Sequence, residues 1–177
     1  MLKGKYVGLR SIERSDLTQL LEWRNQPEFR KYFREYRELN SEFQNRWFES
    51  KVMNDSATLM FAIEDLSSKK LLGACGLCYI DWINKSADFS IYIGAENLYI
   101  DDKFAVDAAK IMMKYGFEEL ALNRLWSEIY DTDNIKKRFF DILGFNLDGI
   151  HRETHWTEGK WCNSLFYSFL KSEYKND

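Results

Sequence analysis

The clearest hydrophobic pattern in the chain lies between Ala105 and Phe145. Within it, the seven residues Arg124–Tyr130 are rich in strand formers and too short for a stable helix. Thr132, Asp133 and Asn134 offer N-cap chemistry for a second helix, which Gly144 would close. The part before this strand, residues 105–120, has apolar residues at the spacing of one helix face and charged residues between them. The apolar residues are Ala105, Ala108, Ala109, Met112, Gly116, Phe117 and Leu120. We therefore expect a helix, a strand, a helix and the start of another strand.

The rest of the chain alternates between strand and helix patterns. We expect helices near residues 17–23 and 42–52, the second beginning with a capping box of Ser41 and Gln44. The strands that we expect are 6–12, 57–64, 71–79 and 87–93, followed by a hairpin of 145–156 and 161–170. The strand over 71–79 is apolar on both sides, which indicates a central position. This order predicts a single α/β domain over residues 1–177, with helix N-termini that attract anions near one end of the sheet.

Composition and charge narrow the classes of function. The 177 residues are 45% hydrophobic and 16% aromatic, with one proline and nine glycines, as in a compact globular chain. A net charge of −3 gives no electrostatic case for nucleic acid or an anionic membrane surface, and it tolerates a cationic, amine-bearing substrate. No apolar run reaches the length of a signal peptide core or a membrane span. We expect a cytoplasmic protein.

Cys75 and Cys78 form a C-x-x-C pair, a spacing often found in metal and redox sites. Residues three apart on a strand face opposite sides, so one ion or one disulfide could not easily take both thiols. Cys162 is the remaining cysteine, and the chain has two histidines. We expect three free thiols in a reducing compartment and no metal.

Residues 118–170 resemble the second half of the GNAT superfamily of acyl-CoA-dependent N-acetyltransferases. The matching motifs are NRLWSEIY on the family's fifth strand, DILGF at a helix end, and Gly149 followed by Arg152. Residues 9–30, LRSIERSDLTQLLEWRNQPEFR, are similar to the family's first strand and helix. The closest likeness is to the branch that acetylates ribosomal proteins, aminoglycosides and nucleotide-linked amino sugars. The resemblance implies a GNAT fold of the α/β (α+β) class, with a mixed, mostly antiparallel sheet of about seven strands, a V-shaped splay between strands four and five, and helices on both faces.

The resemblance also implies acetyl-CoA as co-substrate. The family's diphosphate loop corresponds to residues 100–105, where only Ala105 matches the usual pattern and Asp101 and Asp102 replace bare backbone and a cation. A charge at contact distance is worth about 1 to 4 kcal/mol, so a working site needs both acids turned outward; alternatively they only cap the helix. The residues assigned to the coenzyme are Ile91, Tyr92 and Ile93 on the fourth strand, Lys103, Phe104, Ala105 and Val106 at the helix start, and Asp133, Asn134 and Phe140 after the fifth strand. Asp133 would serve equally well as a simple N-cap.

Glu128 is the candidate general base, because several members of the family carry a glutamate at this point of the fifth strand. The alternative is a strand carboxylate satisfied by a neighbouring arginine or N–H group. The family's tyrosine acid corresponds to Phe140, which cannot donate a proton. Its role would pass to Tyr130, to His151 or His155, or to water, or it is not needed.

The candidate residues for binding the acceptor come from three parts of the chain. Trp23, Arg24 and Asn25 resemble a segment that borders the acceptor in the amino-sugar and aminoglycoside branches, although core packing and a solvated helix end explain Trp23 and Arg24 too. Asp88 and Ser90 would meet the amine from the polar face of the fourth strand, unless Asp88 is merely solvated. His151 and His155 would lie near the same mouth.

Two hypotheses of different classes follow. The first is an acetyl-CoA-dependent N-acetyltransferase that works by direct attack in a ternary complex, on an amino group of a nucleotide-linked sugar, a protein or peptide α-amine, or an aminoglycoside. We expect this enzyme to be a monomer or a homodimer. The second is a GNAT-like domain that has lost catalysis and serves as a binding or scaffold module.

Overall fold

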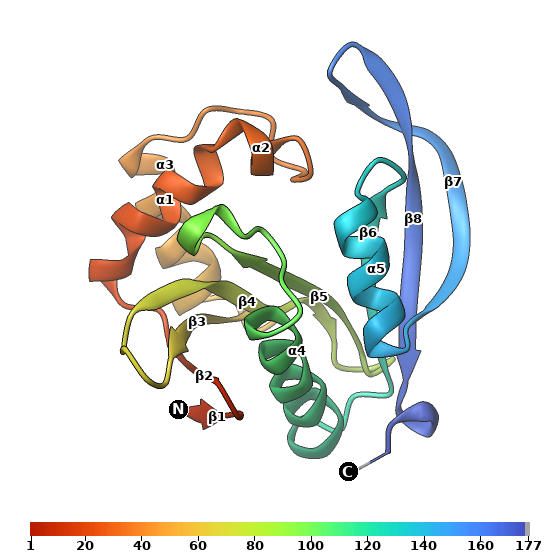
Figure 1. Ribbon diagram of the computed structural model, residues 1–177. Coiled ribbons are helices and arrows are strands. Elements are labelled where there is room, and N and C mark those ends of the chain that lie inside the picture. Colours follow the sequence, from red (N-terminus) through yellow and green to blue (C-terminus); the bar gives the residue numbers. More distant parts are fainter. Residues whose placement is uncertain (176–177) are drawn as a thin grey trace.

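The computed structural model describes residues 1–175, which form one eight-stranded sheet (Figure 1). The strand order is β1-β2-β3-β4-β5-β6-β8-β7, and all neighbours are antiparallel except β5 and β6. The bounds are β1 Leu2–Lys3, β2 Val7–Ser11, β3 Leu59–Asp65, β4 Leu71–Asp81, β5 Ser86–Ile93, β6 Arg124–Tyr130, β7 Asn146–Thr157 and β8 Lys160–Leu170. The expected mixed, mostly antiparallel sheet is confirmed. The additional strand is β1, whose two residues are too few to show an alternating pattern.

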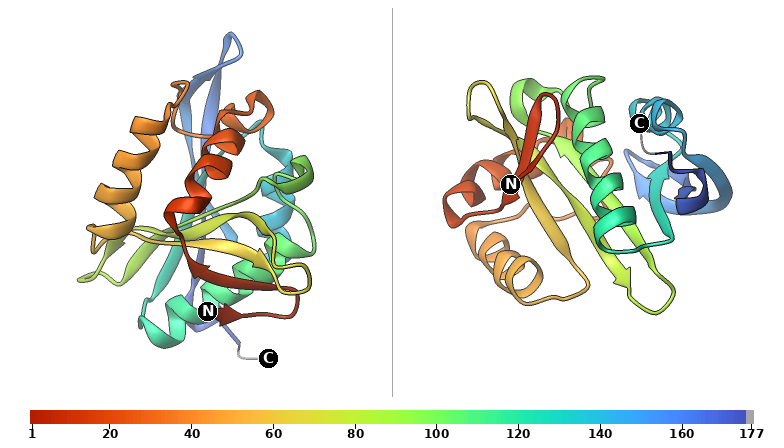
Figure 2. Two further views of the ribbon diagram at one scale, coloured as in Figure 1. Left: turned by 90° about the vertical axis from the view of Figure 1, so that its left-hand side faces the viewer. Right: turned by 90° about the horizontal axis from the view of Figure 1, so that it is seen from below.

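Helices cover both faces of the sheet (Figure 2). Two of them, α1 (Leu17–Asn25) and α3 (Ser41–Trp47), lie on one face, and α4 (Phe104–Lys114) lies on the other. A short α2 (Pro27–Arg30) follows α1, and α5 (Asn134–Leu143) connects β6 to β7. Both α3 and α4 continue into a π-helical turn, over Phe48–Met53 and Tyr115–Glu119. The remaining helical pieces are 3₁₀ turns at Arg14–Asp16, Ala95–Asn97 and Lys171–Glu173.

The splay expected between the fourth and fifth strands of the family is present between β5 and β6. These two strands pair in parallel only from Ser86 to Asp88 and from Arg124 to Trp126. Beyond this short ladder, which we call the seam, they diverge (Figure 1). The backbone groups that face each other past the seam are not joined by a ladder, so the fold opens a space in the middle of the sheet.

Local capping explains where the flanking helices begin. The side chain of Asp133 accepts the N–H of Lys136 at 3.0 Å and so caps α5, and Gly144 ends that helix in the left-handed region at φ 81°. At α3 the capping residue is Asn40, which accepts the N–H of Phe43 at 3.0 Å, and not Ser41 as expected. Gln44 lies on the buried side of α3, with only 2% of it exposed.

One glycine in the sheet centre is required by close approach. A Cβ atom on Gly73 of β4 would lie 2.1 Å from the carbonyl oxygen of Tyr92 on β5. Glycine at this position therefore lets β4 and β5 pack side by side directly behind the splay.

Candidate active site

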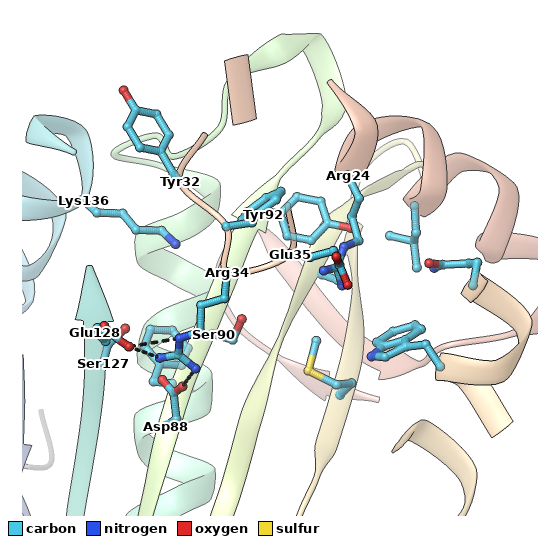
Figure 3. Close-up of a pocket in the computed structure, with 17 residues that line it drawn as sticks. Arg24, Tyr32, Arg34, Glu35, Asp88, Ser90, Tyr92, Ser127, Glu128 and Lys136 are labelled. Atoms are coloured by element: carbon cyan, nitrogen blue, oxygen red, sulfur yellow. Dashed lines mark hydrogen bonds and ion pairs between the residues drawn. The ribbon is translucent and has the colours of Figure 1, made fainter. Parts of the chain in front are cut away.

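A cavity of about 360 Å³ lies at the splay (Figure 3). One wall is the face of β5 that carries Asp88, Ser90 and Tyr92, which alternate along the strand. Glu128 enters from β6 and Lys136 from α5. The opposite side is formed by α1, α3 and the irregular segment of residues 31–40, which contribute Arg24, Tyr32, Phe33, Arg34, Glu35, Gln44 and Trp47.

Two carboxylates face each other across the splay and share one guanidinium. Arg34 Nη1 lies 3.0 Å from Asp88 Oδ2, and Arg34 Nη2 lies 3.0 Å from Glu128 Oε2. The Nε–H of Arg34 also donates to Glu128 Oε2, at 3.1 Å. Ser164 on β8 donates its hydroxyl to the other oxygen of Glu128. Glu128 is thus held in place from behind, with Oε2 directed toward the cavity.

Burial strongly affects the charges at this site. Burial raises the pKa of Asp88, with the charge and hydrogen bond of Arg34 acting against it. Burial also lowers the pKa of Arg34, but the charges of Asp88 and Glu128 outweigh this and raise it above its usual value. The result is an acid pair that contacts a protonated guanidinium at the point where β5 and β6 part.

Lys136 brings a second cation to the cavity (Figure 3). Burial lowers the pKa of its ammonium group, with the charges of Asp133 and Asp88 acting against this. Its Nζ lies 5.4 Å from the centre of the Tyr99 ring, and within residues 1–175 it forms no ion pair. A buried ammonium group without an ion pair is a better proton donor than an exposed lysine.

The N-terminus of α4 is capped by the chain's own acid. Asp101 accepts the N–H of Phe104 at 2.9 Å, that of Ala105 at 2.8 Å and that of Lys103 at 3.1 Å. Of the two alternatives, capping of the helix holds for Asp101, whose side chain reaches these amides from two residues before the N-cap residue Lys103. Asp102 does face outward and pairs with Arg138 of α5 at 2.5 Å.

These contacts test how the helix start suits a coenzyme A diphosphate. The carboxylate of Asp101 is itself an oxyanion, and its two oxygens take the N–H groups that the phosphate oxygens would take. The amides of Phe104 and Ala105 are therefore oriented to hold an anion. A diphosphate fits them once Asp101 rotates away.

A second contact joins the loop after β5 to the start of α5. The hydroxyl of Tyr99, which follows β5, donates to Asp133 Oδ2 at 2.5 Å. Both residues are almost fully buried, and burial together with the Asp133 charge raises the pKa of Tyr99 well above its usual value. Asp133 is thus the N-cap that the sequence suggested, with an additional hydrogen bond to the loop after β5.

The structure brings about a quarter of the residues expected at the site to the cavity: Arg24, Asp88, Ser90, Tyr92 and Glu128. Lys103, Phe104, Ala105 and Val106 lie at the start of α4, as expected for the anion site. Ile91 and Ile93 are buried on the other face of β5. Asn134 begins α5 beside Asp133.

The six other expected site residues also lie outside the cavity. Trp23 is buried and packs on Gly94, where an added Cβ would come within 1.9 Å of its ring. The side-chain oxygen of Asn25 accepts the N–H of Leu39 at 2.9 Å, and its side-chain NH₂ group donates to the carbonyl of Leu39 at 2.8 Å. The remaining four are engaged in ring contacts: Phe140 with Phe145 and Tyr167, Tyr130 with His155, and His151 with Phe166.

Residues that the sequence did not single out complete the cavity. Arg34 lies in a run of alternating aromatic and charged residues that has no helical or strand period. Gln44 is buried against the cavity and its Nε2 has no hydrogen-bond partner within residues 1–175. Lys136 had a usable signal, because it precedes Phe140 by four residues and residues four apart share a helix face.

Cys75, Cys78 and Cys162 are free thiols, and burial raises the pKa of Cys78 to about 12. Within residues 1–175, no three histidine, cysteine or acidic side chains are grouped as metal ligands. The same part of the chain has no helix with the length and apolar character needed to span a membrane.

Comparison with known proteins identifies the family. Residues 7–146 match the model of the acetyltransferase (GNAT) domain, which is well over half of the chain. Spermidine N(1)-acetyltransferase of Escherichia coli K12 is 29% identical over 170 residues, covering 95% of this chain and 88% of that protein. An uncharacterized N-acetyltransferase, p20 of Bacillus licheniformis, is 23% identical over 168 residues, covering 94% and 93%. The crystal structure of spermidine N-acetyltransferase from Vibrio cholerae in complex with CoA and spermine superimposes with a TM-score of 0.86 at 24% identity, covering 95% of this chain and 97% of that one. The chain therefore belongs to the GNAT family of N-acetyltransferases.

Proposed function

We propose that this protein transfers the acetyl group of acetyl-CoA to a primary amine of a small cationic molecule. The observation that carries the proposal is the pair of carboxylates, Asp88 and Glu128, which holds a cation between β5 and β6. An alkylamine is an ammonium ion at neutral pH, with a pKa near that of lysine, about 10.4. The acid pair suits the ammonium form, and the splay gives the amine access to an acyl donor.

The relatives favour a polyamine over the nucleotide-linked amino sugar that the sequence suggested. The E. coli relative is named for spermidine, a molecule with several ammonium groups. The cavity offers Glu35 as a third carboxylate besides Asp88 and Glu128. Hydrogen bonds from Arg37 lower the pKa of Glu35 to about 2, so this side chain is ionised at neutral pH. Asp88 and Glu128 lie where β5 and β6 part, so an ammonium group suits this point of the cavity better than a phosphate.

We assign Glu128 as the general base that accepts the proton of the acceptor amine. The amine must be neutral to attack, and Glu128 Oε2 faces the cavity while Ser164 holds the other oxygen. Asp88 stays with the cation and orients it. Acetyl-CoA supplies the thioester carbonyl, and direct attack needs no covalent intermediate on the protein.

Lys136 is the group that we assign to the proton of the departing thiolate. Phe140, at the family's tyrosine position, is buried in a cluster of rings and cannot donate a proton. Lys136 projects one helical turn earlier from α5 into the cavity, and burial lowers its pKa. Its position in the cavity and its lowered pKa make the ammonium group a better acid than an exposed lysine.

Free-thiol release with acetyl-CoA and a panel of amines tests the proposal. We expect turnover with spermidine and with a monoamine such as n-butylamine, and loss of turnover in the Glu128→Gln variant. Calorimetry with coenzyme A separates binding from chemistry. If neither the native protein nor an Asp101→Asn variant bound coenzyme A or released thiol with any amine, the chain would be a binding module of this family.

A further inference from the structure

We propose that Arg34 is a displaceable internal cation that occupies the subsite of the acceptor's ammonium group, so that acceptor binds by exchange with Arg34. This inference rests on the proposed function, because it names what that site holds before the acceptor arrives. Arg34 contacts both Asp88 and Glu128 at 3.0 Å (Figure 3). No other cation of residues 1–175 forms an ion pair with either carboxylate.

The acid pair requires a positive occupant at all times. The side chain of Asp88 is 7% exposed and that of Glu128 20%, so two negative charges lie close together with little water. Leaving a buried carboxylate without a partner is strongly destabilising. Placing a substrate ammonium beside Arg34 between the same oxygens would put two cations in contact. The acceptor and the guanidinium therefore exclude each other.

Arg34 is placed so that its side chain can leave while the backbone stays. Its side chain is 43% exposed, whereas the carboxylates that it contacts are largely covered. Neighbouring residues hold the segment of 31–40 by other contacts, namely the hydrogen bonds of Leu39 to Asn25 and the edge contact of Phe33 with the Tyr92 ring. The exposed ring of Tyr79, 5.9 Å from the guanidinium carbon, offers a surface for the displaced side chain.

Exchange gives the protein a threshold for its acceptor. The apparent dissociation constant equals the intrinsic constant divided by the fraction of molecules in which the subsite is free. If Arg34 occupies the subsite about nine-tenths of the time, removing it tightens amine binding about tenfold. A polyamine and a monoamine meet the same competition, because the fraction of molecules with a free subsite is a property of the protein.

Calorimetric titration of spermidine and n-butylamine into the Arg34→Gln variant, without acetyl-CoA, tests the exchange. We expect both amines to bind about tenfold tighter than to the native protein, by the same factor for each, because the fraction of molecules with a free subsite does not depend on the amine. The Arg30→Gln variant is the matched control, because Arg30 pairs with Glu38 outside the cavity and its loss removes the same charge. Unchanged or weaker amine binding to Arg34→Gln would overturn the inference.

Two further measurements keep the test decisive if Arg34→Gln folds poorly. In the native protein, the ¹⁵N signal of the Arg34 Nε–H should move to its solvent-exposed position as spermidine is added, while that of Arg30 stays. An Arg34 signal that does not respond at saturating spermidine would overturn the inference. Arg34→Lys, which keeps the charge but loses the guanidinium fork, should bind amines with intermediate affinity. Tighter amine binding without thiol release would support the exchange and refute the proposed function, whereas turnover with unchanged binding would do the reverse.

Discussion

Replacing Asp101 by asparagine should strengthen coenzyme A binding. The Asp101 carboxylate takes the N–H groups of Phe104 and Ala105, at 2.9 and 2.8 Å, which a diphosphate would need. A diphosphate that approaches these amides meets a negative charge within contact distance, or must first displace it. Such a charge is worth about 1 to 4 kcal/mol. Since 1.4 kcal/mol is tenfold in affinity, removing it should tighten binding by about fivefold to several hundredfold.

The substitution should leave the fold intact. Asparagine caps helices about as well as aspartate, so α4 keeps its first turn and the free energy of unfolding changes little. Asp102→Asn is the matched control, because it removes the same charge from the next residue, which faces outward to Arg138.

Calorimetry with coenzyme A and with pantetheine, which lacks the diphosphate, is the assay. The gain in Asp101→Asn should appear with coenzyme A and be absent with pantetheine, and Asp102→Asn should show a smaller gain. Equal affinity of native protein and Asp101→Asn for coenzyme A would refute the reasoning, as would an equal gain for pantetheine.

Three further predictions concern catalysis and stability. Lys136→Met should lower kcat about 100-fold with little change in KM for the amine, and it should remove the basic limb of the pH profile of kcat. Thiol release measured between pH 6 and 10 will give this profile, and an unchanged profile would exclude Lys136 as the acid. Arg10→Met should cost about 2 kcal/mol at pH 7 in urea unfolding, because Asp16 is buried and loses its bidentate partner. Burial acts to raise the pKa of Asp16, but the hydrogen bonds from Arg10 and from the N–H of Glu13 lower it below 3.8. The stabilisation by Arg10 is therefore present above that pH. The difference in the free energy of unfolding between variant and native protein should shrink as the pH falls below it. Gly73→Ala should cost about 1 to 3 kcal/mol, because its Cβ would meet the Tyr92 carbonyl, whereas Gly149→Ala, with nothing within 4 Å, should be near neutral in the same urea titration.

The elements with strong local signals were predictable from the sequence. β6 spans the expected residues 124–130, and α5 begins at Asn134 behind the Asp133 cap and ends before Gly144. These boundaries depend on neighbours within four residues, which a sequence pattern records. The splay was predictable only through the family resemblance, because no local pattern shows where two strands stop pairing.

The candidate site was predictable in its acids and not in their partners. Asp88 and Glu128 lie on strands whose alternation was visible, so their common face could be anticipated. Arg34 reaches them from a segment without any period, over separations of 54 and 94 residues. Which guanidinium turns inward is a matter of tertiary packing, and the run KYFREYRELN contains two candidates, Arg34 and Arg37.

The two adjacent acids before α4 show the same limit on a smaller scale. The sequence placed Asp101 and Asp102 at the helix start but did not decide which one faces the amides. For Phe140, which the resemblance assigned to the coenzyme, the structure shows a ring packed with Phe145 and Tyr167.

The seam between β5 and β6 joins the halves of the sheet through three residue pairs. On one side of it β1 to β5 form a continuous plate, and on the other β6, β8 and β7 form a second plate. Two plates that share so narrow a hinge line can change their dihedral angle without breaking either ladder. The amide hydrogens of the seam should accordingly exchange with solvent sooner than those between β3 and β4, and any molecule wedged between the plates should slow that exchange.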